Sequence, residues 1–228
     1  MLLVHGWEGS GADLVPVAES LVEAGYRAAL VDLPAHGRSG GRRTSLVEWL
    51  RALRAVAGVV GPIHAAVGHS FGGAAVALAL AEGDVEARGA VLIAPAVGPA
   101  EFVERFARTI GLPADRTAGM VRRLGARVGR DIASLDVRRA ARAIALPALV
   151  LHDPLDREVP WEHARAIADA WTGSRLVARQ GLGHRRILAD AESIRAVVEF
   201  VAGLDAGGAA PPRLEDAVPE SAAVQAPG

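Results

Sequence analysis

The stretch Val67-Gly68-His69-Ser70-Phe71-Gly72-Gly73 decides the fold of this chain. It contains the pattern Gly-x-Ser-x-Gly, with the serine at position 70. Between a strand and a helix, this pattern is typical of a sharp turn that presents a nucleophilic serine. Such a turn holds the serine in a strained backbone conformation, and a glycine two residues to either side avoids the clash that a Cβ would make.

The flanking residues predict the strand and the helix that this turn requires. Residues 63–67 are a short apolar run, as in a buried strand, and residues 74–81 are an alanine-rich run that favours a helix. The N-terminal N–H groups and dipole of that helix would point at the serine. The pattern also arises by chance in glycine-rich chains, and this chain has 26 glycines. The rest of the chain must therefore decide between the two interpretations.

Composition bounds the class of protein. A chain of 228 residues predicts one domain, or one domain with an insertion. The net charge of −1 gives no general argument for binding nucleic acid or an anionic membrane. Cysteine is absent, which excludes disulfides and thiolate metal sites. Lysine is absent too, which excludes a Schiff base and a Gly-x-x-x-x-Gly-Lys phosphate loop.

The sequence indicates a soluble, cytoplasmic protein. The N-terminus lacks a charged region and reaches Gly6 too soon for a signal peptide. The sequence also lacks an apolar run of about 18 residues, so we expect no membrane span.

Strands and helices alternate along most of the chain. The predicted strands are apolar throughout, which is typical of a parallel sheet covered on both faces. We expect strands at residues 2–5, 28–31, 63–67, 90–93, 148–152 and 175–178. We expect helices at 13–24, from 44 or 45 to 56, at 74–81, 161–171 and 190–202.

Residues 99–145 interrupt this alternation. They contain three helix-like segments, 101–110, 115–128 and 131–144, with ten arginines against five acidic residues. We interpret them as a helical lid inserted into an α/β core formed by residues 1–98 and 146–202. Residues 203–228 are rich in Ala, Pro, Gly and acids, so we expect a disordered tail there.

Reactive side chains follow several predicted strands. Ser70 follows the third, Asp153 and Asp156 the fifth, and His184 the sixth, while His5-Gly6-Trp7 follows the first. The carboxyl ends of parallel strands meet at one edge of a sheet, so these loops should converge. Among triad enzymes, the chain order serine, acid, histidine is that of the α/β-hydrolases.

With these motifs together, the chain resembles an α/β-hydrolase fold serine hydrolase, and within that family small bacterial esterase-like members. The motifs are His5-Gly6-Trp7, Asp32-x-Pro-x-His-Gly-x-Ser39, Gly68 to Gly73, and Asp156-x-x-Val-Pro with Gly183-His184. The resemblance implies the α/β-hydrolase fold: a mostly parallel sheet of about six strands with helices on both faces and a helical lid.

One feature departs from the family pattern. Family members usually begin with two further strands that form an antiparallel edge, and these are missing here. The strand at residues 28–31 would then be an exposed sheet edge unless something covers it. Three explanations stay open: the true gene product starts further upstream, the chain forms a homodimer, or it is less stable.

The resemblance also implies roles for the site residues. Ser70 would be the nucleophile, His184 the base that accepts its proton, and Asp156 the acid that orients the imidazole. The family places its acid three residues before Val-Pro, which selects Asp156 and leaves Asp153 as second choice. The backbone N–H groups of Trp7 and Phe71 would form the oxyanion hole. No cofactor and no metal are expected.

Other residues keep two interpretations. Either an acyl pocket or the core of the lid is formed by Phe102, Phe106, Ile110, Met120 and Leu124. The lid arginines either form a solvated face or contact an anionic group of the substrate. His5, His36 and Asp32 are expected to hold loops in place by hydrogen bonds.

The expected partner is a small-molecule acyl ester, and the expected reaction is its hydrolysis through a Ser70 acyl-enzyme. A thioester or an amide stays open as substrate. An acyltransferase would use the same acyl-enzyme with another acceptor, and a binding protein without catalysis would use only the fold.

Overall fold

The computed structural model describes residues 1–205, and within them six strands form one sheet with all pairs parallel. The strand order is β2-β1-β3-β4-β5-β6. The prediction of disorder for residues 203–228 falls, from residue 206 on, outside the described part. The strands are β1 (Leu2–Val4), β2 (Ala29–Val31), β3 (Ala65–His69), β4 (Gly89–Ile93), β5 (Ala148–His152) and β6 (Ser174–Ala178). The predicted parallel sheet of about six strands is thereby confirmed.

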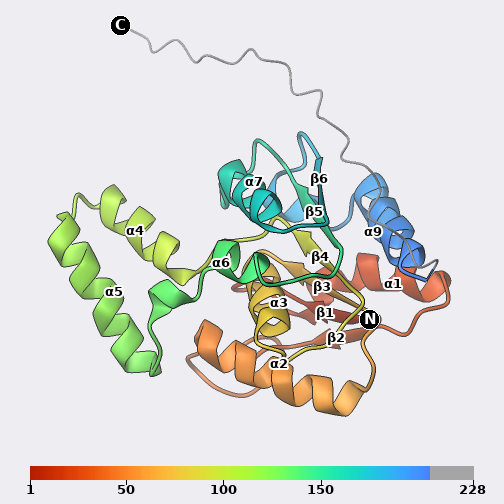
Figure 1. Cartoon of the computed structure of the whole chain (residues 1–228), viewed down its shortest axis with the longest axis horizontal. Coiled ribbons are helices and arrows are strands. Elements are labelled where there is room, and N and C mark those ends of the chain that lie inside the picture. Colours follow the sequence, from red (N-terminus) through yellow and green to blue (C-terminus); the bar gives the residue numbers. More distant parts are fainter. Residues whose placement is uncertain (206–228) are drawn as a thin grey trace, which may run out of the picture.

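Helices cover both faces of the sheet, as Figure 1 shows. On one face lie α1 (Val15–Glu23), which follows a 3₁₀ turn at Gly11–Leu14, and α9 (Ala191–Gly203). On the other lie α2 (Leu46–Val60), α3 (Phe71–Ala81) and α7 (Trp161–Ala170). This arrangement explains why the strands are apolar throughout, since neither face meets water.

Alternate strand residues supply the two hydrophobic cores. In β1, Leu2 and Val4 pack with α2 and α3, whereas Leu3 packs with α1 and α9. The same alternation holds in β4, where Ala90 and Leu92 face one core and Val91 faces the other. Successive side chains of a strand point to opposite faces, so each strand contributes to both cores.

The strand β2 forms one edge of the sheet. It pairs only with β1, and Leu30 at its centre is 39% exposed. The prediction that this strand is an exposed edge is therefore confirmed for the described residues. No helix among residues 1–205 combines the length and the apolar character that a membrane span needs.

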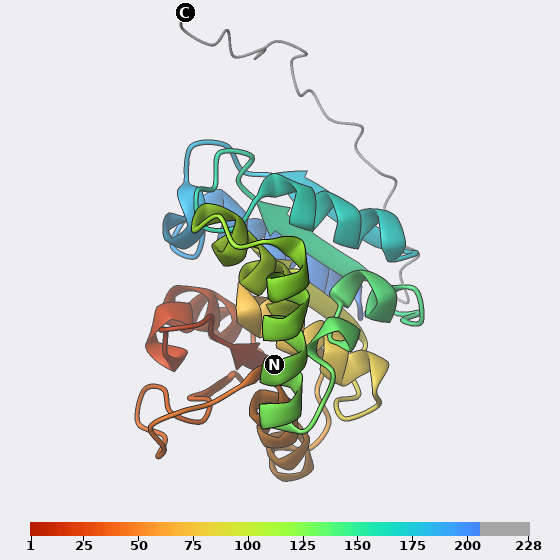
Figure 2. The same cartoon turned by 90° about the vertical axis from the view of Figure 1, so that its left-hand side faces the viewer.

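The segment between β4 and β5 is helical. It contains α4 (Pro99–Thr109), α5 (Ala114–Val128), a 3₁₀ turn at Ile132–Ser134 and α6 (Val137–Ala141). In Figures 1 and 2, α4 and α5 stand out from one side of the sheet, whereas α6 packs against the helices α3 and α7. Although about 55 residues separate them in the chain, β4 and β5 are direct neighbours.

The predicted continuous helix over residues 131–144 was wrong. Two aspartates divide the segment, because each caps a new turn instead of continuing a helix. The side chain of Asp131 accepts a hydrogen bond from the N–H of Ala133 (3.0 Å), and that of Asp136 accepts one from the N–H of Arg138 (2.8 Å). Short polar side chains compete with the helical backbone in this way.

Close packing around β3 predicts that a side chain at Gly68 destabilises the fold. A Cβ built on Gly68 would lie 2.5 Å from the carbonyl oxygen of Gly72 and 2.6 Å from the Cα of Gly73. Because these are backbone atoms of the elbow, we expect Gly68→Ala to lower the free energy of unfolding by at least about 2 kcal/mol. Gly58 in α2 has no atom within 4 Å of such a Cβ, so Gly58→Ala should instead raise stability by about 0.5 kcal/mol.

Urea unfolding of both variants beside the wild-type chain measures the difference. Equal stability of the two alanine variants would contradict the close packing at Gly68.

Candidate active site

Ser70 occupies a strained turn between β3 and α3. Its backbone has φ 54° and ψ −121°, a region that side-chain-bearing residues rarely adopt. Its N–H donates to the carbonyl of Ile93 (2.9 Å), and its carbonyl accepts from the N–H groups of Gly73 (3.0 Å) and Ala96 (3.2 Å). Strain of this kind costs about 1–3 kcal/mol, and these bonds to β4 and α3 hold it in place.

The elbow packs directly on the first strand. A Cβ on Gly72 would collide with the carbonyl oxygens of Val4 and His5, and one on Gly6 would lie 3.0 Å from the Cβ of Ser70. Only glycines allow this approach of the two backbones. As a result, the loop after β1, which carries Trp7, lies beside Ser70.

Asp156 and His184 are joined by a hydrogen bond. The Nδ1–H of His184 donates to Oδ2 of Asp156 at 2.6 Å. The other carboxylate oxygen accepts from the N–H groups of Glu158 (2.8 Å) and Val159 (3.0 Å), and the side chain is fully buried. Burial works against ionisation, but the bonds from His184, Val159 and Glu158 outweigh it and hold the pKa of Asp156 below its ordinary value.

Asp153, the second choice for the acid, has a different environment. Its Oδ1 accepts from the N–H of Leu155 (2.8 Å), and its Oδ2 accepts from the N–H of Gly183. The residue is 1% exposed. Asp153 therefore ties the loop after β5 to the loop that carries His184, while Asp156 is the carboxylate that faces the imidazole.

His184 lies on a short helical turn, α8 (Gly183–Arg186), where the sequence predicted a loop. Its carbonyl oxygen accepts a hydrogen bond from Nε2–H of His69 (2.9 Å). Since Nδ1 is bonded to Asp156, the Nε2 atom is free to act as a base toward the cavity, which Ser70 and His184 both line. His69, the residue before the nucleophile in the elbow, was not assigned this link by the sequence.

A second histidine lies behind the acid. His152 is fully buried at the end of β5, and its Nε2 lies 3.6 Å from Oδ2 of Asp156 while donating to the carbonyl of Val159 (3.0 Å). Burial lowers the pKa of His152, so the ring is neutral beside the carboxylate. From the sequence, His152 has no assigned role, because nothing in the pattern of strand β5 distinguishes it from a core residue.

Two backbone N–H groups near Ser70 are available to a ligand. Among residues 1–205, the N–H groups of Trp7 and Phe71 donate to no other group. Phe71 is the first residue of α3, where intrahelical acceptors are lacking. Both residues were predicted to supply the oxyanion hole, and both line the same cavity as Ser70.

That cavity has a volume of 1420 Å³ and an aromatic wall. The ring of Phe71 lies 5.8 Å from that of Trp7 and 5.1 Å from that of Phe102. Of the predicted substrate-contacting residues, Phe102 and Leu124 line the cavity, whereas Phe106, Ile110 and Met120 do not. Phe106 is 53% exposed on α4. The sequence assigned all of these residues to the inserted helices, but only the tertiary structure decides which side chains face the cavity.

The residues expected to hold loops do form such hydrogen bonds. His5 donates from Nδ1 to the carbonyl of Gly6 (2.7 Å) and accepts at Nε2 from the N–H of Leu33 (3.0 Å). His36 accepts from the N–H of Glu8 (3.1 Å), and Asp32 accepts from Gly11 (2.7 Å) and Arg38 (2.8 Å). These bonds fix the loops after β1 and β2. Within residues 1–205, no three His, Asp or Glu side chains gather as metal ligands.

Comparison with protein families identifies the class. The family model of the alpha/beta hydrolase fold matches residues 1–129, and a model described as TAP-like protein matches residues 130–203. The chain belongs to the α/β hydrolase fold family. No curated protein sequence matches it significantly.

Solved structures share the fold at low identity. A monoacylglycerol lipase of Paleococcus ferrophilus has a TM-score of 0.71 and 23% identity, covering 89% of this chain and 93% of the other. Est1E from Butyrivibrio proteoclasticus with bound ferulic acid has 0.69 and 24%, covering 90% and 88%. A putative non-heme bromoperoxidase, BpoC, from Mycobacterium tuberculosis H37Rv has 0.68 and 18%, covering 89% and 91%. These proteins carry names of different activities, so the fold alone does not determine the reaction.

The buried position of His69 beside His184 predicts how the stability of the protein depends on pH. Burial, together with the neighbouring His184, lowers the pKa of His69 to about 3. His69 thus stays neutral in the folded chain while it protonates in the unfolded chain near its ordinary value. Its contribution to stability is complete above about pH 6.5 and is lost as the pH falls toward about 3.

Between about pH 7 and about pH 5, we expect the wild type to lose roughly 2 kcal/mol more unfolding free energy than His69→Gln. The glutamine keeps an N–H donor for the carbonyl of His184 but does not titrate. Urea unfolding at the two pH values measures this, and parallel losses in both proteins would refute the buried neutral histidine. The other buried histidines are present in both proteins and cancel in the comparison.

Proposed function

We propose that this protein is a serine hydrolase that cleaves a carboxylic ester through an acyl-enzyme on Ser70. The observation that carries the proposal is the hydrogen bond between His184 and Asp156 at a cavity that Ser70 also lines. A serine on a strained elbow, a histidine with a free Nε2 and a buried carboxylate that fixes its tautomer are the three groups of a catalytic triad.

In the proposed reaction, Oγ of Ser70 attacks the ester carbonyl carbon while Nε2 of His184 takes its proton. Asp156 stabilises the imidazolium, and its bond to Nδ1 leaves Nε2 as the nitrogen that acts as the base. His184 then returns the proton to the departing alcohol. A water molecule, deprotonated by His184, attacks the acyl-enzyme, and Ser70 leaves with that proton as the acid is released.

The negative charge of the tetrahedral intermediate would develop beside Trp7 and Phe71. Their unpaired N–H groups and the N-terminus of α3 supply fixed positive dipoles there. One such donor typically contributes roughly 10²–10³ in rate. The cavity favours an ester with an apolar part, since Trp7, Phe71 and Phe102 form its wall near the serine. The monoacylglycerol lipase among the structural neighbours agrees with ester chemistry.

Labelling by a fluorophosphonate, which reacts only with an activated serine, tests the nucleophile. We expect the wild type to be labelled and Ser70→Ala and Ser70→Gly to be unlabelled and inactive on p-nitrophenyl esters. Because φ of Ser70 is 54°, glycine fits this position better than alanine does. The free energy of unfolding of Ser70→Gly should therefore be about 1 kcal/mol higher than that of Ser70→Ala. Labelling that persists in Ser70→Ala, or its absence in the folded wild type, would overturn the proposal.

Substitution of Asp156 and of Asp153 should affect kcat to different extents. Asp156→Asn removes the carboxylate that orients His184, so we expect kcat to fall by roughly 10³-fold or more. Asp153→Asn disturbs two backbone hydrogen bonds, so we expect it mainly to lower the free energy of unfolding, by about 1–3 kcal/mol. Steady-state kinetics with urea unfolding of both variants measures the two effects, and the reverse ranking in kcat would move the acid to Asp153.

A further inference from the structure

The walls of the cavity carry an excess of positive charge. Seven arginines and four acidic residues line it. The arginines are Arg42, Arg43, Arg51, Arg105, Arg127, Arg157 and Arg185, and the acids are Glu8, Asp13, Glu48 and Glu158. They come from the loops after the strands, from α2 and from the inserted helices, so no single amphipathic helix accounts for them.

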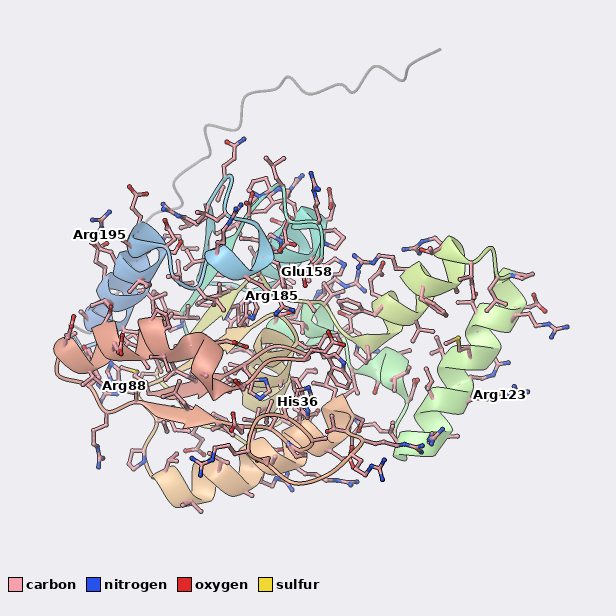
Figure 3. All side chains as sticks on the ribbon, turned by 180° about the vertical axis from the view of Figure 1, so that it is seen from behind. His36, Arg88, Arg123, Glu158, Arg185 and Arg195 are labelled. Atoms are coloured by element: carbon pink, nitrogen blue, oxygen red, sulfur yellow. The ribbon has the colours of Figure 1, made fainter. Side chains whose placement is uncertain are left out.

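Most of these arginines have no acidic partner. Arg185 lies 3.7 Å from Glu158, and the two are neighbours in Figure 3. The other six arginines make no ion pair with any of residues 1–205. Two of the four acids are held by hydrogen bonds within the chain, since Asp13 accepts from the N–H of Ser10 (3.0 Å) and Glu48 accepts from the hydroxyl of Ser45 (3.2 Å). The charge excess is therefore available to a ligand.

The excess is largest where α2 and α5 meet. Arg42 and Arg43 precede α2, Arg51 lies on it, and Arg127 lies in the last turn of α5. Figures 1 and 2 show the C-terminal end of α5 beside the beginning of α2. On these two helices and the residues just before α2, Glu48 is the one acid that lines the cavity. The apolar residues Leu124 and Val128 of α5 and Leu46 of α2 form the floor below the arginines.

We infer that the substrate is an ester bearing a carboxylate or phosphate group remote from the scissile bond. The inference rests on the proposed function and specifies its substrate class. Arginine stays charged at all relevant pH values and binds both anions through paired N–H groups. A cavity of 1420 Å³ holds far more than a short neutral ester. The acyl chain would lie along the apolar floor, with its anionic end at the arginines of α2 and α5.

Three p-nitrophenyl esters that differ only at the far end of the acyl chain test this. They are the ester of hexanoic acid, the mono-ester of adipic acid and the ester of 5-phosphonopentanoic acid, which end in methyl, carboxylate and phosphonate. We expect kcat/KM for at least one anionic ester to exceed that of hexanoate by about tenfold or more at low salt. This ratio should decline as salt screens the charges. A better phosphonate or a better carboxylate identifies which anion the site takes.

Charge removal locates the anion site. In Arg51→Gln/Arg127→Gln, we expect the ratio of anionic to neutral kcat/KM to fall by about tenfold. Arg123 lies on the same helix as Arg127 but does not line the cavity, and Figure 3 shows it on the outer side of α5. Arg123→Gln is thus the matched control, and its ratio should equal that of the wild type.

The outcomes separate the substrate class from the reaction. Turnover of hexanoate with a ratio of one or less for both anionic esters would overturn the anionic substrate and leave the serine hydrolase standing. A ratio that falls equally in Arg123→Gln would assign it to general surface charge and also overturn the inference. No turnover of any ester, together with no fluorophosphonate labelling of Ser70, would overturn the proposed function and this inference with it.

Discussion

The structure depends on the close approach of the elbow to the first strand. The strained turn at Ser70 is possible only because Gly68 and Gly72 leave no Cβ between β3, α3 and the carbonyl oxygens at the end of β1. Hydrogen bonds from the turn to β4 hold it from the other side. The strain is thus compensated by backbone packing of the central strands, which are the most buried part of the sheet. The backbone at Ser70, the proposed nucleophile, is thereby fixed before any ligand arrives.

Backbone contacts also hold the loops that carry His184 and Asp156, the proposed base and acid, at the edge of the sheet where Ser70 lies. Asp153 joins the loop after β5 to Gly183, and His69 joins the elbow to the carbonyl of His184. Neither side chain needs to touch a substrate to matter, because each fixes the loop that carries a reacting group. Asp156 is buried without solvent, and the N–H groups of Glu158 and Val159 replace the water it has lost. Positioning therefore comes mainly from hydrogen bonds to the main chain.

The core and the inserted helices contribute different properties. The two hydrophobic cores, one on each face of the sheet, hold alternate side chains of the same strands. The strands are therefore rigid, and their carboxyl ends form the edge where the loops converge. The helices α4 and α5 stand away from that edge and close one side of the cavity with apolar residues and arginines. The core thus carries the residues of the proposed triad, whereas the inserted helices, α2 and the residues just before α2 carry most of the arginines that line the cavity.

The sequence alone determined the parallel sheet, the elbow and the positions of the serine, acid and histidine, because these depend on local patterns and on the rule that parallel strands end at one edge. It placed Asp156 ahead of Asp153 only by resemblance. The tertiary structure decided which carboxylate faces His184, because both follow the same strand and only the loop path separates them. It also decided the break between residues 131 and 144, the exposure of Phe106 and the meeting of arginines from α2 and α5. These features depend on how segments that are distant in the sequence pack together, and a local sequence pattern does not specify such contacts.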